Sequence, residues 1–489
     1  MSKIEAYLKV IAADRSLEIV TDAKALKKYT AKNLSGKEVF APVAIVFPTS
    51  AAQVEAVMKA ANEAEVNITV RSSQGEESLT GTSLPWKEDS VVLNLSKMNN
   101  VIHIDALNNM AIVEAGVTFA QLQNELKKQG LYMEHPLQVR NEKSVIAALL
   151  DRDPVLTAKH LWDVPDPLCA MKMVFGNGRL FGSGSAAGPG TLEEMLEAGC
   201  AMNQAQGPVW LDFGRVITGS QGTLAVVCWA SVKVRPIGSC RTMTYVQSDN
   251  VDTLGEYASH CIRRRLGEEA VILNKKGMKT IFGIDEKAAE KMPEWTYVSS
   301  ARGFRFFPEE YMNNQVEDMK DIAKGFGLTL VTELKGLDNA AAMKALDEPS
   351  KKNDFWKLRD GKQIVDLFCL NTLDVVGKFT KIAAKAAEKS GLDPKELIAY
   401  AQPSQMARNC HIEFVINAGE KAAELEDILG SALLDNNAFF SRPYGTLEPK
   451  VYRKYTAQRH FMPSIKSVFD AKGILNPGKL ASGYEGGAI

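Results

Sequence analysis

The polar loop between residues 71 and 81 holds the first side chains whose types suggest a chemical role. It follows a β-rich segment that ends at Val70, and it contains Arg71, Ser72, Ser73, Gln74, Gly75 and Gly81. Small residues let backbone N–H groups approach a phosphate, and the guanidinium of Arg71 adds positive charge. The alternative is an ordinary surface loop between two strands, and these residues alone favour that alternative.

A second glycine-containing loop, residues 219–223, comes directly before an apolar strand. Gly219 and Gly222 bracket a Ser-Gln turn, and Thr223 and Val226 follow. Glycine beside a strand is typical of a place where the backbone passes close to another group, here something flat or charged. A plain hairpin turn is the alternative interpretation for this loop.

The elements that must position these loops alternate between strands and helices. A strand stops at Pro48, and Thr49 or Ser50 is expected to cap a helix with apolar residues at Val54, Val57, Met58 and Ala61. Residues 100–132 predict two strands joined by a turn at 108–109 and then a helix that ends at Gly130. The turn 176–178 predicts a hairpin between a strand at 171–175 and one that runs through Phe181.

Taken in order, these segments resemble the FAD-binding domain of the vanillyl-alcohol oxidase, p-cresol methylhydroxylase and glycolate or D-lactate dehydrogenase superfamily. The segments VVLNLSKMN, VEAGVTFAQL and GSQGTL match, and IKSVFDAKGILNPGK is similar to the family's carboxyl-terminal element. The resemblance implies an α+β fold, with a two-lobed FAD-binding domain and an α+β cap domain with an antiparallel sheet. The expected divisions are an N-terminal arm (1–40), the FAD-binding domain (41–236), the cap or substrate domain (237–450) and a returning C-terminal segment (451–489).

The resemblance also implies which residues face the cofactor. Loops 71–81, 143–148 and 219–227 should meet FAD, together with the C-terminal element. Loop 71–81 has no histidine of the kind that tethers the flavin in some members, so FAD is expected to bind non-covalently. The expected cofactor residues are Arg71, Ser72, Ser73, Gln74, Gly75, Gly81, Ser144, Ala147, Gly219, Gly222, Thr223, Val226, Asn476 and Lys479.

Two of these loops depart from the family pattern. Ser72, Gln74 and the carboxylates Glu76 and Glu77 stand where the family usually has a glycine-rich phosphate loop, and Ala147 and Ala148 replace glycines. Carboxylates repel a pyrophosphate unless they point outward, and a methyl group obstructs close backbone approach. An alternative function is therefore a degenerate, flavin-poor structural subunit of a hetero-oligomeric oxidoreductase complex.

Four residues are candidates for chemistry on the substrate. The resemblance aligns His411 with the family's histidine motif, and an imidazole has a pKa suited to taking a hydroxyl proton. Tyr444 could bind or deprotonate a substrate oxygen, and Arg442 and Arg359 could clamp a carboxylate. The alternative for His411 is a half-buried strand histidine hydrogen-bonded to a neighbour, and the alternative for the two arginines is a structural salt bridge. The metal-binding motifs of glycolate-type members are incomplete, so no metal is expected.

Composition limits the partners. A formal net charge of −1 gives no electrostatic reason to expect nucleic acid or an anionic membrane. Seven scattered cysteines without a C-x-x-C pair argue against an iron–sulfur cluster, and they favour a reducing, cytoplasmic setting. The resemblance to the superfamily implies a dehydrogenase for an alcohol, a 2-hydroxy acid or a phenolic compound. It would form a homo- or hetero-oligomer and pass electrons to an electron-transfer flavoprotein, an iron–sulfur subunit or a cytochrome.

Overall fold

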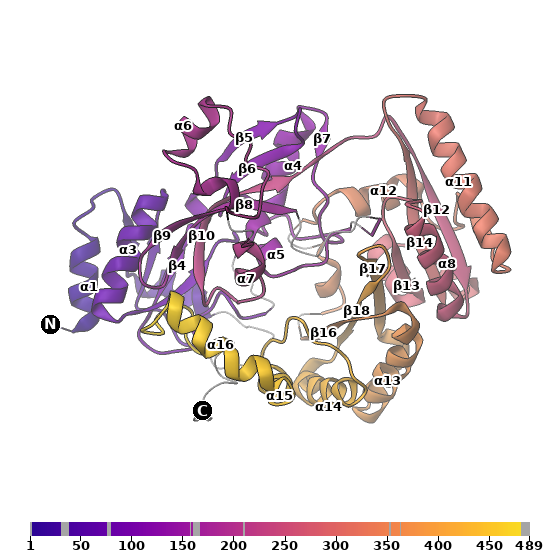
Figure 1. Ribbon diagram of the computed structural model, residues 1–489. Helices are drawn as coiled ribbons and strands as arrows, with labels where there is room; N and C mark the ends of the chain where they lie inside the picture. Colours follow the sequence, from indigo (N-terminus) through magenta and orange to yellow (C-terminus); the bar gives the residue numbers. More distant parts are fainter. Residues whose placement is uncertain are drawn as a thin grey trace.

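The computed structural model describes residues 2–30, 39–75, 80–156, 158–159, 167–208, 211–351, 354–361 and 363–480. The amino-terminal half and the carboxyl-terminal tail form one lobe, and the residues between them form a second lobe beside it (Figure 1). The predicted α+β class and its antiparallel cap sheet are both present.

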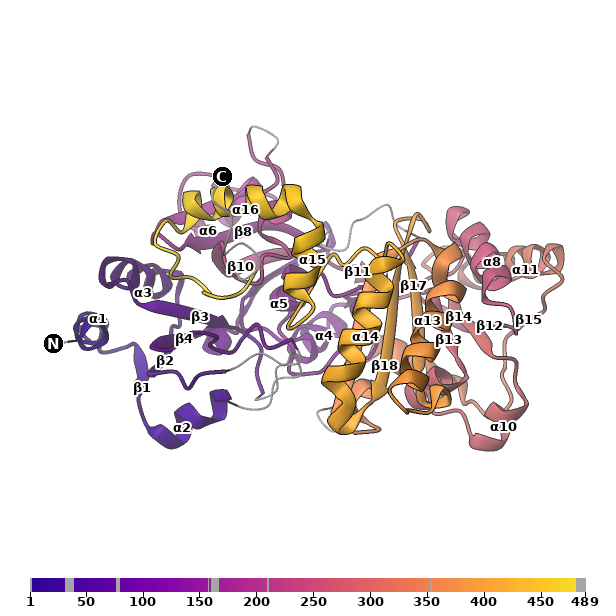
Figure 2. The same ribbon diagram turned by 90° about the horizontal axis from the view of Figure 1, so that it is seen from below.

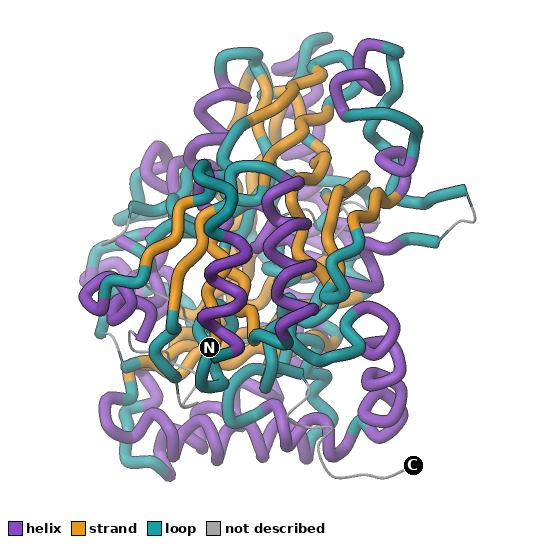
Figure 3. The backbone as a smooth tube through the Cα atoms, turned by 90° about the vertical axis from the view of Figure 1, so that its left-hand side faces the viewer, coloured by secondary structure: helices purple, strands orange, loops and turns teal. Residues whose placement is uncertain are grey.

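A four-stranded sheet opens the first lobe, in the order β1-β2-β4-β3. Strands β2, β4 and β3 are parallel, whereas β1 is antiparallel to β2. The predicted cap is confirmed, because Ser50 Oγ accepts from the backbone N–H of Gln53 at the start of α3. Figure 3 shows two helices in front of the strands near the amino terminus. The elements are α1 (Lys3–Ile11), β1 (Glu18–Val20), α2 (Ala23–Lys27), β2 (Ala44–Phe47), α3 (Ala51–Ala64), β3 (Asn67–Arg71) and β4 (Ser90–Asn94).

An antiparallel five-stranded sheet completes this lobe, in the order β5-β6-β10-β8-β9. The predicted hairpin is confirmed, since β8 pairs with β9 across the turn at residues 176–179. One face packs with α3 and the four-stranded sheet, and the other face packs with α4 and α5. The elements are β5 (Val101–Asp105), β6 (Met110–Glu114), α4 (Phe119–Lys127), β7 (Leu131–Tyr132), α5 (Val145–Leu150), β8 (Leu168–Phe175), β9 (Leu180–Ser183), α6 (Leu192–Glu197), α7 (Phe213–Ile217), β10 (Ala225–Lys233) and β11 (Arg235–Pro236).

The second lobe contains a seven-stranded sheet in the order β15-β12-β14-β13-β17-β18-β16. The edge strand β15 is short, because only Leu330–Val331 pairs with β12. The strands are β12 (Cys240–Ser248), β13 (Val271–Asn274), β14 (Trp295–Gly303), β15 (Leu330–Val331), β16 (Ile364–Asn371), β17 (Ile398–Ser404) and β18 (Asn409–Asn417).

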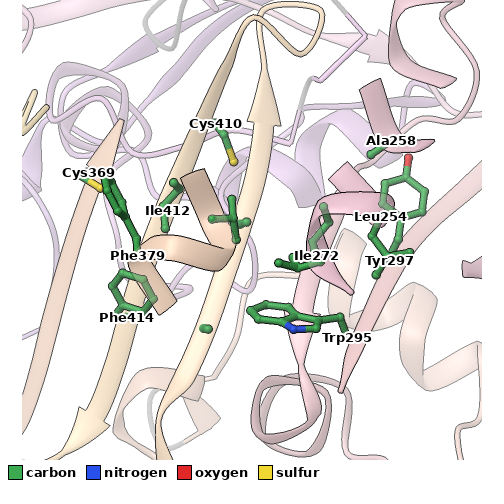
Figure 4. Packing of buried hydrophobic residues seen from close by; sticks show 14 of the residues in the cluster. Leu254, Ala258, Ile272, Trp295, Tyr297, Cys369, Phe379, Cys410, Ile412 and Phe414 are labelled. Atoms are coloured by element: carbon green, nitrogen blue, oxygen red, sulfur yellow. The ribbon is translucent and has the colours of Figure 1, made fainter. Parts of the chain in front are cut away.

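Helices cover both faces of the cap sheet. Four long helices bury one face in a large apolar core, part of which Figure 4 shows around Ile412, Phe414 and Trp295. These helices are α8 (Val251–Arg263), α11 (Pro308–Gly325), α13 (Val376–Lys389) and α14 (Ala422–Asp435). A second core on the other face involves η4 (Met278–Phe282), α10 (Glu286–Lys291), α12 (Asn339–Asp347) and η6 (Trp356–Leu358), and α9 (Lys275–Gly277) leads into η4.

The carboxyl-terminal segment returns to the first lobe. Helix α15 (Glu448–Lys454) lies beside the cap helix α14 and packs Val451 into the cap core, and α16 (Thr456–Phe469) runs along the first lobe (Figures 1 and 2). Beyond them, Leu475 pairs in parallel with Ile68 at the free edge of β3. None of the helices described is both long enough and apolar enough to cross a lipid bilayer.

Candidate active site at the junction of the two lobes

A cavity of about 220 Å³ lies where the loops of the first lobe meet the cap sheet. The loop after β3, the start of α5 and the loop before β10 all contribute to its wall, as does the carboxyl-terminal segment. The cap supplies η6 and side chains of β16, β17 and β18. Loops that are far apart in the sequence therefore meet at one site. Of the predicted residues, the wall includes Arg71, Ser72, Ser73, Ala147, Gly222, Asn476 and Arg442, and Gln221 of the predicted loop 219–227 joins them.

The other predicted residues do not contribute to this wall, within the ranges that the structure describes. Val226 points to the opposite side of β10, because side chains of a strand alternate, and it joins the core around α3. Its neighbours Ala225 and Val227 contact the cavity instead. Thr223 and Lys479 line a separate cavity beneath α16. The remaining predicted residues do not line the cavity: Gln74, Gly75, Gly81, Ser144, Gly219, His411, Tyr444 and Arg359. Glu76 and Glu77 are outside the described residues.

The loop after β3 is held by hydrogen bonds to the neighbouring segment. Gln74 N donates to the carbonyl of Glu142 at 3.0 Å, and Ser144 N donates to Ser73 Oγ at 3.1 Å. The Arg71 guanidinium donates to the carbonyl of Gly75 and lies 5.2 Å from the ring centroid of Tyr29. The N-terminal arm thus contacts the site through Tyr29. The sequence analysis assigned no role to that arm.

The start of α5 forms the second part of the wall. Ser144 Oγ accepts from Ala147 N at 3.0 Å and donates to the carbonyl of Ala115 at 2.6 Å. These bonds fix the first turn of α5, in which Ile146 and Ala147 face the cavity. Ser144 is therefore a supporting residue behind the wall.

The loop before β10 contributes Gln221 and Gly222. Gln221 has a φ of 52°, and its Nε2 donates to the carbonyl of Pro443 at 2.8 Å. Its Oε1 is buried and has no hydrogen-bond partner in the described part of the chain. Gly222 is required here, because a Cβ would lie 2.5 Å from Nδ2 of Asn476. This loop therefore presents an open acceptor to the cavity.

Residues at the carboxyl terminus tie the first and third loops together. Asn476 Oδ1 accepts from Val70 N at 3.0 Å, and Nδ2 donates to the carbonyl of Gln221 at 2.7 Å. Lys479 is buried and donates to Asn476 Oδ1 at 3.2 Å. Burial lowers the pKa of Lys479 to about 7, although Glu448 opposes this shift.

The cap sheet turns a polar face toward the cavity and an apolar face toward its helices. Directly paired residues share a face, and Glu413 pairs with both Tyr400 and Phe368. His411 and Asp366, two residues away from Glu413 and Phe368 along their strands, lie on that same face. The alternate residues Cys369, Cys410, Ile412 and Phe414 pack into the opposite core (Figure 4).

A buried charge network occupies this polar face. Lys357 Nζ lies 2.7 Å from Asp366 Oδ2 and also contacts Glu413 Oε1. Glu413 Oε2 is 2.7 Å from Nε2 of His411. Burial raises the pKa of Asp366 to about 7, with Lys357 opposing and Glu413 reinforcing the shift. Burial lowers the pKa of His411 well below its usual range, and Arg442 and Lys357 act in the same direction.

Arg442 connects this network to the first lobe. Its Nη1 donates to Asp153 Oδ1 at 2.7 Å and to the carbonyl of Asp151 at 3.1 Å, and its guanidinium carbon lies 4.1 Å from the centroid of the Phe368 ring. Burial would raise the pKa of Asp153, but Lys143 and Arg442 outweigh it and lower the pKa. Cations and carboxylates therefore alternate across the junction of the lobes.

Two predicted residues have positions that the sequence did not indicate. Tyr444 is packed 6.0 Å from the Phe368 ring, and burial, followed by Asp151, raises the pKa of its hydroxyl. Arg359 donates to the carbonyl of Thr280, to Gln138 Oε1 at 3.3 Å and to the carbonyl of Asp354 at 3.0 Å. Arg359 thus joins η4 to the first lobe at a distance from the cavity wall.

Sequence reasoning missed Lys357, Asp366 and Glu413 as wall residues. The available signal was a charged residue within an otherwise apolar strand, as in IVDLFCL and HIEFVI. That pattern places an ionisable group on one face of a strand. It does not say whether that face meets solvent or another lobe, so the role of these residues depended on tertiary structure.

The site suits FAD. Loops assigned to it meet at one cavity, Ala115, Ala225 and Val227 form a wall of small uncharged side chains, and Gln221 Oε1 offers an acceptor to an N–H group. The volume of about 220 Å³ is below the range of roughly 300–1,000 Å³ that is usual for small-molecule sites. This space therefore corresponds to part of a dinucleotide.

Comparisons with known proteins agree with this arrangement. Residues 42–183 match the model of a FAD binding domain. A D-lactate dehydrogenase from Archaeoglobus fulgidus is 23% identical over 89% of this chain and 90% of its own length. The flavoprotein subunit of 4-cresol dehydrogenase [hydroxylating] from Pseudomonas putida is 32% identical over 31% of this chain and 29% of its own.

Solved structures show the same fold. A crystal structure of p-cresol methylhydroxylase with substrate bound has a TM-score of 0.79 at 18% identity, and the match covers 98% of this chain and 96% of that one. An alkyldihydroxyacetonephosphate synthase has a TM-score of 0.71 at 15% identity, with 97% and 86% covered. The chain thus carries a FAD binding domain at residues 42–183, has the fold of p-cresol methylhydroxylase and is an FAD-dependent oxidoreductase.

Proposed function

We propose that this protein is a dehydrogenase that oxidises an alcohol, a 2-hydroxy acid or a phenolic compound, with a 2-hydroxy acid as the first candidate. The observation that carries this proposal is the position of Arg442 and Lys357 on the cavity wall opposite the flavin loops. Lys357 is paired with Asp366 and Glu413, so it is the edge of the Arg442 guanidinium left unpaired among the described residues that favours a substrate with a negative charge. Relatives that match almost the whole chain are D-lactate dehydrogenases, whereas the 4-cresol enzyme matches about a third of it.

Arg442 is suited to holding a substrate carboxylate. Within the described residues its hydrogen bonds are all made by Nη1, so Nε and Nη2 remain for a planar, two-point contact. The Asp153 carboxylate and the Phe368 ring fix the guanidinium plane. Lys357 would add charge at the same wall, and Tyr444 would support Phe368 from behind.

The cofactor supplies the hydride acceptor, and loops 71–75, 144–147 and 219–222 with Asn476 would hold it. The chain itself must orient the substrate, exclude water and accept the hydroxyl proton. Phe355, Trp356 and Phe368 provide an apolar wall for water exclusion. His411 lies behind Glu413 and would orient that carboxylate.

We also propose that FAD binds without a covalent bond. Among the described residues that line the cavity there is no histidine or cysteine, and the hydroxyl of Tyr400 donates to Gln402 Oε1. Trichloroacetic acid precipitation should therefore release all of the yellow colour into the supernatant. Colour that stays with the pellet would overturn the non-covalent assignment.

Electrons are proposed to leave the flavin for a partner protein, namely an electron-transfer flavoprotein, an iron–sulfur subunit or a cytochrome, within a homo- or hetero-oligomer. One relative is named as a flavoprotein subunit, and another, from Arabidopsis thaliana, is named D-lactate dehydrogenase [cytochrome]. All seven cysteines are free thiols, which supports a reducing, cytoplasmic setting.

The test is anaerobic flavin bleaching. The purified protein should show flavin absorbance and lose it when D-lactate, D-2-hydroxyglutarate or 4-cresol is added in turn. Bleaching by a hydroxy acid supports the leading candidate, and bleaching by 4-cresol alone moves the substrate to the phenolic class. A colourless folded protein, or flavin that none of these compounds reduces, would overturn the proposed function.

A further inference from the structure

Three ionisable groups on the cap face compete for the role of proton acceptor. They are His411 and Glu413 on β18 and Asp366 on β16, and all three belong to the network around Lys357. A general base needs an acceptor atom that a substrate hydroxyl can reach. The hydrogen bonds of each group therefore decide between them.

His411 and Glu413 are already engaged with each other. Nε2 of His411 is 2.7 Å from Glu413 Oε2, and the imidazole does not contribute to the cavity wall as far as the structure describes it. Glu413 does line the cavity, but its other oxygen contacts the ammonium of Lys357. Neither group offers an open acceptor to a substrate.

Asp366 differs in this respect. Its Oδ2 lies 2.7 Å from Lys357 Nζ, and its carboxyl also shares a hydrogen bond with that of Glu413, whereas no N–H donor among the described residues reaches its buried Oδ1. The residue lines the cavity next to Phe368 and Lys357. An unpaired buried acceptor is costly in a folded protein and commonly marks a functional position.

We propose that Asp366 accepts the hydroxyl proton of the substrate, and that Lys357 and the Glu413–His411 pair position its carboxylate. The assignment rests on the proposed function. The substrate O–H bond breaks and its proton passes to Asp366 Oδ1. The C–H bond breaks with its electron pair, which reduces the flavin as a hydride, and the C=O bond forms. The Asp366 proton leaves to water after the product dissociates.

The electrostatics agree with this role. Burial raises the pKa of Asp366 to about 7, so the carboxylate can both accept and release a proton near neutral pH. Glu413 reinforces the shift and Lys357 opposes it. The charged and titratable groups around Asp366 are Lys357 on η6, Glu413 and His411 on β18, Tyr400 on β17, and Arg442 and Asp153 from the junction.

The test compares Asp366→Asn with His411→Asn and with the control Asp374→Asn, an exposed carboxylate shortly after β16. Each holoenzyme is mixed anaerobically with D-lactate, D-2-hydroxyglutarate or 4-cresol, and flavin reduction is followed in stopped flow. Asp366→Asn should slow reduction by about 100- to 10,000-fold. Its bound FAD and its reduction by dithionite should not change. The wild-type rate should rise with pH through about 7, and His411→Asn should keep a pH dependence of this form.

An infrared pH titration gives a readout that needs no substrate. A protonated carboxylic acid band should titrate near neutral pH in the wild type and in Asp374→Asn. Asp366→Asn should lose one carboxyl's share of this band and keep the rest, because burial also raises the pKa of Glu134 and of Glu426 to about 7. Equal reduction rates for wild type and Asp366→Asn, or an unchanged infrared titration in that variant, would overturn the assignment alone. A wild-type flavin that no probe reduces would overturn the proposed function and the assignment together.

Discussion

Asn476 Nδ2 donates to the main-chain carbonyl of Gln221 at 2.7 Å, across 255 residues of sequence. The Oδ1 of the same side chain accepts from Val70 N at 3.0 Å. One amide therefore joins the loop after β3 to the loop before β10, from the carboxyl-terminal segment. The two loops that the sequence assigned to the cofactor have a defined spacing because of this side chain.

Removing the Asn476 amide should loosen both loops. Asn476→Ala loses three partly or fully buried hydrogen bonds, and we expect it to lower the free energy of unfolding by roughly 1–3 kcal/mol and to reduce FAD retention. Asn476 has a φ of 44°, a backbone conformation that strains alanine but not glycine. Asn476→Gly therefore removes the side-chain hydrogen bonds without adding backbone strain. Asn417→Ala is the matched control, because that exposed amide donates to a single carbonyl at 2.7 Å. Urea denaturation and FAD content are the measurements. Equal FAD retention in all three variants would show that the bridge does not hold the site.

Glu142 should weaken cofactor binding. A Cβ at Gly75 would lie 2.3 Å from Glu142 Oε2, so this carboxylate is packed against the loop expected to meet the cofactor phosphates. Glu142→Gln removes a like charge worth about 1 kcal/mol, which corresponds to roughly fivefold tighter FAD binding to the apoprotein at low salt. The gain should shrink as salt is added. Fluorescence titration measures it, with Glu125→Gln on α4 as the control, and an unchanged or weaker affinity would contradict this electrostatic account.

The pair formed by Arg442 and Asp153 should be costly to break on one side. Arg442→Ala leaves the partly buried carboxylate of Asp153 without one of its two cationic neighbours. Such a change usually lowers the free energy of unfolding by about 3–5 kcal/mol. Lys143 remains 3.5 Å from Asp153, so we expect the lower end of that range. The single variants Arg442→Ala and Asp153→Ala and the double variant form a double-mutant cycle, and urea denaturation measures the free energy of unfolding of each. Additive losses in the cycle would mean that the pair is not coupled.

Lys479 should make stability depend on pH. Its folded-state pKa is lowered to about 7 from 10.5, so the unfolded chain binds more protons between these values and stability rises with pH across that window. Below about pH 7 the full cost of burying the ammonium remains, roughly 5 kcal/mol at most. Lys479→Met should therefore stabilise the apoprotein most at low pH, and the difference should disappear as pH approaches 10. Thermal melts across this range measure it, and Lys472→Met, at a more exposed lysine of the same cavity, should show no such trend.

The sequence by itself determined the family, the order of the elements and several local features. The cap of α3 at Ser50 and the hairpin at 176–178 depend on neighbouring residues, so local pattern was sufficient to predict them. The segment 465–479 was recognised from its contiguous residues, among which Asp470 accepts from the backbone N–H groups of Ile474 and Leu475.

Only the tertiary structure decided which ionisable groups meet. Strand alternation could place His411 and Glu413 on one face, but it could not show that Lys357, from a separate short helix, would lie between Glu413 and Asp366. It also could not show that Arg359 would bind main-chain carbonyls away from the cavity while Arg442 joined the two lobes. These contacts arise between segments far apart in sequence, and their identity depends on how two lobes pack, which periodicity along one strand does not encode.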